Sequence, residues 1–238
     1  ADKMTEKEFT GTAVLSWKPV DDWMTYASYS RGYKAGGFNL DRSALAPSST
    51  VITPAAVANL RFDPEKVDAF EIGAKFDRGP FSLSATAFHQ AFRNFQLNTF
   101  DGTVFIVQNV NGCSASLGGA DRDQSKFAGA ANFNATAAAT GACAAGNVGY
   151  GVVSQGVELE ASLVPARDFR VSAGFTYADT KYRNDLVGNN AGAPLNPALR
   201  VLPGQNLSNA PQVVVTGSAA WTPELGNTGL SGLFYIDG

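Results

Sequence analysis

The sequence has few charged residues, one histidine, two cysteines and no long apolar run. Charged residues make up 16% of its 238 residues, whereas about 25% is typical of a soluble domain. No stretch of about 18 apolar residues exists, which excludes a transmembrane helix. Low charge without such a run fits a transmembrane β-barrel, in which only every second residue faces lipid. A secreted all-β domain fits this composition equally well.

The net charge of −3 names no partner, and no basic stripe indicates nucleic acid. Catalytic motifs are also missing: the sequence has no nucleophile elbow, phosphate loop or zinc pattern. His89 has no cysteine or carboxylate at ligand spacing, so no metal site is predicted. We therefore expect no catalytic residue, no cofactor and no enzymatic activity.

Seven segments alternate apolar and small polar residues with a period of two, the pattern of a strand with two different faces. Six of them have a clear apolar face. In the segment from about 23 to 34, Met24 and Tyr26 compete with Ala27 and Tyr29 for that face, and the alternation does not decide between them. An eighth strand is expected to begin at Leu230.

The polar faces of these strands favour a barrel over a sandwich. They are rich in Ser, Thr, Gly and Ala and carry few charges. A soluble sandwich turns this face to water and needs more Lys and Glu there. A crowded, wet lumen does not.

Short and long connections alternate along the chain. Short turns are predicted near 19–22, 77–80, 165–168 and 223–229, and long loops at about 35–64, 100–150 and 183–210. Loops of this length are uncommon in compact domains. Their place on one edge is typical of outer-membrane barrels, which have short periplasmic turns and long extracellular loops.

Aromatic side chains flank the short turns and predict a membrane-interface girdle. Its members are Trp17, Trp23, Phe76, Phe81, Phe169 and Trp221. A second girdle is expected about 9–11 residues along each strand, although strands are rich in aromatics in any case.

Three stretches carry a family resemblance. They are residues 26–39 (YASYSRGYKAGGFN), 62–76 (FDPEKVDAFEIGAKF) and 154–160 (SQGVELE), the last followed by a strand ending at 177–179. They resemble recurrent barrel-strand motifs of TonB-dependent outer-membrane receptors, in the family's order, and span nearly the whole chain.

The resemblance implies a bacterial outer-membrane protein with a 22-stranded barrel and an N-terminal plug. It also implies active import of a scarce solute, such as a siderophore, vitamin or saccharide, with energy from the TonB complex. Residues 1–238 are then expected to be a barrel fragment, all-β, antiparallel and up-and-down, with about seven to eight strands. The plug, the TonB-contacting N-terminal region and the closing strands are expected to be absent, and membrane lipid is an expected partner.

Six residues are candidates for particular roles. Cys113 and Cys143 lie in one long loop that faces an oxidising space, which favours a disulfide over two free thiols. Glu158 and Glu160 share one strand face and are expected to line the lumen, a better interpretation than the carboxylate pair of a glycosidase. Arg31 and Lys34 are possible contacts for an anionic ligand or for lumen carboxylates.

Two other functions stay open from the sequence. A passive outer-membrane porin would lack the upstream plug domain. A secreted β-sandwich or adhesin domain would be recovered as a soluble protein, whereas a barrel fractionates with outer membranes.

Overall fold

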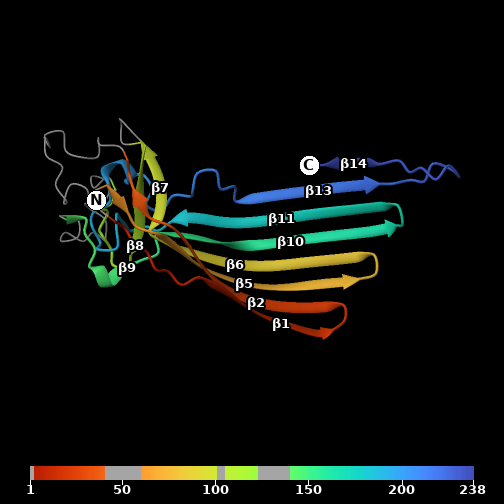
Figure 1. Cartoon of the computed structure of the whole chain (residues 1–238), viewed down its shortest axis with the longest axis horizontal. Helices are drawn as coiled ribbons and strands as arrows, with labels where there is room; N and C mark the ends of the chain where they lie inside the picture. The colour runs from red at the N-terminus through yellow and green to blue at the C-terminus, as the bar shows by residue number, and fades with distance from the viewer. Residues whose placement is uncertain (1–2, 41–59, 101–104, 123–139) are drawn as a thin grey trace.

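A computed structural model of the chain describes residues 3–40, 60–100, 105–122 and 140–238. Its main element is one antiparallel sheet of eight strands, each paired with its neighbours in chain order (Figure 1). The strands are β1 (Gly11–Val20), β2 (Trp23–Lys34), β5 (Glu65–Arg78), β6 (Phe81–Arg93), β10 (Val152–Ala166), β11 (Phe169–Tyr182), β13 (Val213–Trp221) and β14 (Phe234–Asp237). This order confirms the predicted all-β, up-and-down fold. The edge strands β1 and β14 are not paired with each other, so the barrel is partial.

The two ends of the sheet differ in their connections. Tight turns join β1 to β2, β5 to β6, and β10 to β11 at one end, while the long connections gather at the other, which we call the loop end (Figure 1). The last connection differs from the prediction, because β14 begins at Phe234 and not at Leu230. Leu230 instead accepts a hydrogen bond from the Leu225 N–H (2.9 Å), which closes a small hairpin before β14.

The long connections contain structure of their own. The short elements are β3 (Gly37–Phe38), β4 (Arg61–Phe62), β7 (Phe95–Phe100), β8 (Phe105–Cys113), β9 (Val148–Gly149), β12 (Leu186–Val187) and the 3₁₀ turns η3 (Ala145–Asn147) and η4 (Pro197–Leu199). The hairpin of β7 and β8 starts where the main sheet stops, because Asn94 takes a left-handed backbone conformation (φ 52°) that asparagine tolerates. The second long connection therefore begins at 94, and not at about 100. In the described ranges, no helix has the length and apolar character to cross a membrane.

Strand register decides which face each residue of β2 occupies. Ala27 lies between Leu15 of β1 and Ile72 of β5. Since neighbours across strands share a face, Ala27 and Tyr29 belong to the apolar face. Met24 and Tyr26 belong to the polar face.

The packed core lies at the loop end and not within the sheet. One buried cluster comprises Val110, Val152, Tyr182, Leu186, Leu195 and Leu199. Val152 pairs with Tyr182 and with Phe92, and alternation puts all three on the polar face. The loops therefore fold over the polar face at this end, and the hydrophobic effect holds them there.

Candidate functional site

Asparagine side chains bind β8 to segments that are distant in sequence. The Asn39 amide donates to the Val107 carbonyl (2.9 Å) and accepts from the Val107 N–H (2.8 Å). Asn109 makes the same pair of bonds with Asp63, accepting from its N–H (2.6 Å) and donating to its carbonyl (3.0 Å). A side-chain amide carries the donor and acceptor of a peptide group. It can thus join two segments that do not pair as strands.

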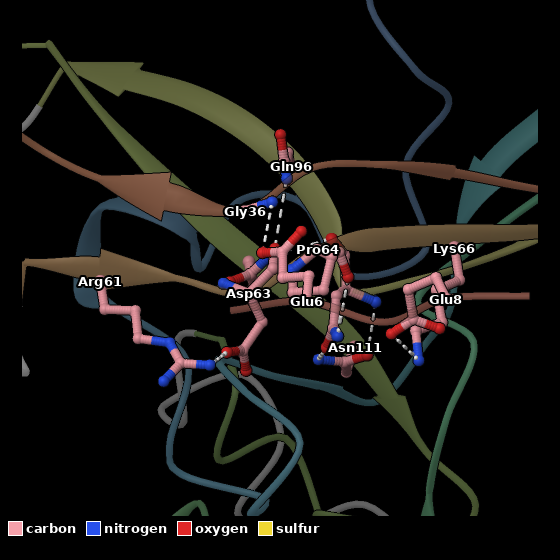
Figure 2. A network of polar contacts seen from close by, with 11 residues as sticks. Glu6, Glu8, Gly36, Arg61, Asp63, Pro64, Lys66, Gln96 and Asn111 are labelled. Carbon is pink, nitrogen blue, oxygen red and sulfur yellow. Dashed lines mark hydrogen bonds and ion pairs between the residues drawn. The ribbon is translucent and has the colours of Figure 1, made fainter. Parts of the chain in front are cut away.

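A pair of asparagines, Asn94 and Asn111, is buried in the same region. Asn111 Oδ1 accepts from the Asn94 N–H (2.8 Å), and Asn111 Nδ2 donates to Asn94 Oδ1 (2.7 Å). Asn94 is 1% exposed and Asn111 0% exposed. Because water does not reach these side chains, their polar groups depend on each other for hydrogen bonds. Gln96 extends the network, donating to the Ala35 carbonyl (2.8 Å) and, through its backbone N–H, to Glu65 (2.7 Å). Figure 2 shows Asp63, Gln96 and Asn111 of this network close together.

Asn39, Asp63, Val107 and Asn109 of this network form one wall of a cleft of about 1020 Å³. The opposite wall comes from the connection after β12. The described lining residues are Asn39, Arg61, Phe62, Asp63, Ile106, Val107, Gln108, Asn109, Gly188, Asn189, Ala193, Pro194, Leu195, Asn196, Pro197 and Arg200. The volume is at the upper end of that of small-molecule sites, and the lining is rich in amides.

Two arginines give the cleft a positive balance. Arg61 lies 3.4 Å from Asp63, and this carboxylate is the one acidic group among the described lining residues. Arg200 follows η4, where Asn196 accepts a hydrogen bond from the Ala198 N–H (2.9 Å) and fixes the turn. The Arg200 Nε is buried, and the described part of the chain supplies no acceptor for it. A buried unpaired donor is costly, so this nitrogen is a strained point of the fold beside the cleft.

The disulfide-bonded loop supports the wall opposite the asparagines. Cys113 and Cys143 are joined, with their Cα atoms 6.0 Å apart, and the Cys143 N–H donates to the Gly192 carbonyl (2.9 Å). Only glycine fits at 192, because its φ is +78° and a Cβ would lie 1.9 Å from the Cys143 carbonyl oxygen. Asp121 accepts from the Leu186 N–H (3.0 Å), and burial raises the pKa of this carboxyl above its usual range.

The four predicted ligand or lumen contacts do not line this cleft. Glu158 and Glu160 are exposed on the polar face. Glu160 lines a separate hollow of about 640 Å³ on that face, together with Lys75. Lys34 also lies on the polar face, at the loop end.

Arg31 lies on the other side of the sheet. Register pairs it with Asp68 of β5, in line with the apolar-face residues Tyr29 and Phe70. Its guanidinium forms two bonds with the Asp68 carboxylate (2.7 and 2.9 Å). Its carboxylate partner is thus Asp68 on the apolar face, and a contact with a ligand stays a prediction. The sequence could not show the face of Arg31, because the parity of β2 was undecided.

The six predicted girdle residues share the apolar face at the turn end. Trp23 pairs with Phe76 (ring centroids 6.1 Å apart), and Phe169 pairs with Trp221. Trp17, Trp23, Phe81 and Trp221 are exposed large side chains. This arrangement is the one a membrane-interface girdle requires, and that role stays a prediction.

Sequence reasoning missed the residues of the cleft. Asn109 and Asn111 alternate with Val110, the pattern of a strand that has amide side chains on one face. This pattern could have predicted β8 inside the loop expected at about 100–150. Arg61 and Arg200 carry no comparable local signal, since each is a single cation near a turn.

Comparisons with known proteins agree with this architecture. Residues 1–238 match the family model described as TonB dependent receptor-like, beta-barrel. Three similar solved structures are the ferric yersiniabactin uptake receptor FyuA from Yersinia pestis (TM-score 0.52, 16% identity), the alcaligin outer membrane receptor FauA from Bordetella pertussis (0.50, 16%) and BauA, the ferric preacinetobactin receptor from Acinetobacter baumannii (0.50, 16%). The alignments cover 95%, 98% and 96% of this chain, but only 24%, 29% and 24% of those structures. No curated protein matches the sequence.

Proposed function

This chain belongs to the TonB-dependent receptor-like β-barrel family, and we propose that it forms part of the wall and outer loops of a receptor that imports a scarce solute. It is a bacterial outer-membrane protein. The observation that carries the proposal is the match of the whole chain to the family's barrel model. This membership favours an active receptor over the passive porin and over the secreted sandwich.

The loop-end cleft is the proposed capture site on this chain. The loops that form it fold over the polar face, so a solute arriving from outside would meet the cleft before the lumen. The whole receptor would add an upstream plug and a segment that contacts the TonB complex. The present chain would bind and orient the solute, and the TonB complex would supply the energy for its passage.

The charge of the cleft supports an anionic, oxygen-rich solute such as a ferric siderophore. Arg61 and Arg200 both line the cleft, and the one carboxylate among its described lining residues is that of Asp63. Both guanidinium groups could form charge-assisted hydrogen bonds to carboxylate, catecholate or hydroxamate oxygens of a bound solute. Two of the three solved structures are named as receptors for ferric ligands, although at 16% identity they support the fold and not the solute.

The test uses the purified full-length receptor and a panel of ferric siderophores of different charge, with binding followed by tryptophan fluorescence. We expect saturable binding of an anionic complex, and a loss of about 10- to 100-fold in affinity for Arg200→Gln. Arg167→Gln, in the β10–β11 turn at the far end of the sheet, is the matched control and should bind like the natural protein. Growth of a deletion strain under iron limitation gives the second measurement. Unchanged growth together with no binding of any ferric complex would refute the proposal.

A further inference from the structure

A second, smaller pocket lies on the apolar face of the sheet at the loop end. It has a volume of about 250 Å³, and its lining includes Arg31, Tyr33, Lys66, Asp68 and Arg93. Lys66 lies between Tyr33 and Arg93 across the strands, and Arg31 faces Asp68 one row below. All five therefore share the face that carries Tyr29, Phe70 and Ile72. Glu8 and Phe9 of the N-terminal segment, together with Tyr150 of the connection before β10, complete the lining on this apolar face.

The depth of the pocket follows from the strand that passes it. Trp23, at the turn end, and Tyr33 lie ten residues apart on β2. Ten residues span about 33 Å along a strand, or about 25 Å along the membrane normal at a tilt of about 40°. This is about the height of the apolar band of an outer-membrane barrel. If Trp23 marks the inner interface, the pocket lies at the outer one, where lipid headgroups begin.

One of the two acidic groups of the pocket, the Asp68 carboxylate, already has a full set of hydrogen-bond donors. Asp68 accepts hydrogen bonds from Tyr29 (2.7 Å), from Tyr150 (2.9 Å) and from two nitrogens of Arg31. Its side chain is 10% exposed, whereas that of Arg31 is 44% exposed. Asp68 thus holds Arg31 in place while part of the guanidinium still faces outward. A carboxylate with four donors has little capacity left for a further cation.

The remaining groups give the pocket one net positive charge. Three cations (Arg31, Lys66 and Arg93) stand against two carboxylates, Asp68 and Glu8. Lys66 lies 2.7 Å from Glu8, and Arg93 donates to the Val148 carbonyl. Arg31, Lys66 and Arg93 each have further N–H donors that the contacts described here do not use. Phe9, which is 82% exposed, and Tyr33 add apolar surface beside them.

We propose that this pocket binds the phosphate of an anionic lipid headgroup in the outer leaflet of the outer membrane. Arg31, Lys66 and Arg93 donate to the phosphate, and Phe9 and Tyr33 pack against the start of the acyl chains. Basic side chains at headgroup depth attract anionic lipid by just this combination of charge and position. The site is distinct from the capture cleft, so it does not depend on which solute is imported.

For the test, the full-length receptor and its variants are reconstituted in nanodiscs of phosphatidylethanolamine with a minor share of phosphatidylglycerol. After extraction, native mass spectrometry measures which lipid each protein retains. We expect phosphatidylglycerol to be retained selectively. Arg31→Gln combined with Arg93→Gln should lower its retention about 25-fold, or about five-fold for each cation removed. Lys34→Gln, on the same strand but the opposite face, is the control and should leave retention unchanged.

Two further arms keep the experiment decisive. Arg93→Gln alone leaves the Asp68 contacts intact, so it reports on binding even if the double variant does not fold; it should lower retention about five-fold. Inorganic phosphate at the same concentration should not displace the lipid. Equal losses in Lys34→Gln, no loss in Arg93→Gln, or full displacement by inorganic phosphate would each overturn the lipid site.

Discussion

The ring of Tyr26 lies across Gly73 on the polar face of the sheet, so close that a Cβ at residue 73 would come within 2.5 Å of it. The Tyr26 hydroxyl reaches one strand further, to the hydroxyl of Thr86 (2.9 Å). A glycine that leaves room for a neighbouring aromatic ring is a known device for pinning strand register. Here it locks β2, β5 and β6 together and explains why a tyrosine occupies the polar face.

Enlarging residue 73 should therefore destabilise the barrel. Gly73→Val forces the Tyr26 ring away and breaks its bond to Thr86, at a cost of about 1–3 kcal/mol typical of overpacking. Thermal unfolding of the full-length receptor in detergent, followed by its heat-modifiable gel mobility, measures the change. Tyr26→Phe removes only the hydroxyl and should cost about 0.5–1.5 kcal/mol. Equal stability of Gly73→Val and the natural protein would contradict the packing described.

Adjacent residues of β2 should face different environments. A nitroxide label on Ala27→Cys is expected to be accessible to oxygen dissolved in lipid, because Ala27 lies on the apolar face beside Ile72. A label on Ser28→Cys should be far less accessible to oxygen. The native cysteines are bonded to each other and do not take up label. The reverse pattern in electron paramagnetic resonance power saturation would show that the assigned parity is wrong.

The buried asparagine pair should control the stability of the loop end. Asn111→Ala leaves two polar groups of Asn94 without their partner, and each unpaired buried group costs about 1–3 kcal/mol. Hydrogen exchange of β7 and β8 should become faster by the corresponding factor, while the main sheet changes little. Asn98→Ala, at an exposed position of β7, is the matched control. Similar exchange rates in the two variants would argue against the network.

Removing the disulfide should loosen the same region from its other side. Cys113→Ser combined with Cys143→Ser reopens a loop of 30 residues. From chain entropy, the lost stabilisation is about 3–4 kcal/mol. Limited proteolysis should then cut within the loop, while the barrel keeps its heat-modifiable mobility. A direct check is a thiol assay on unreduced, denatured protein, which should find no reactive thiol. Two reactive thiols would rule out the bond.

The sequence predicted where a candidate site would lie better than it predicted which residues form that site. The expectation that a solute is captured at the loop end came from the family resemblance, together with the alternation of short turns and long loops. The residues that line the cleft did not, because Asn39, Asp63 and Arg200 meet only after three connections fold together. Arg31 was noticed in the sequence, but its face and its partner Asp68 were not predictable from β2 alone.

By itself the sequence determined the strands, the turns, the uneven lengths of the connections and the family. These features are local or follow chain order, since alternation and turn residues act between neighbours along the chain. Only the tertiary structure decided the parity of β2, the asparagine network, the Arg200 Nε that has no partner among the described residues, and the basic pocket on the apolar face. Each of these depends on which residue lies opposite in space, and that is set by cross-strand register and loop packing.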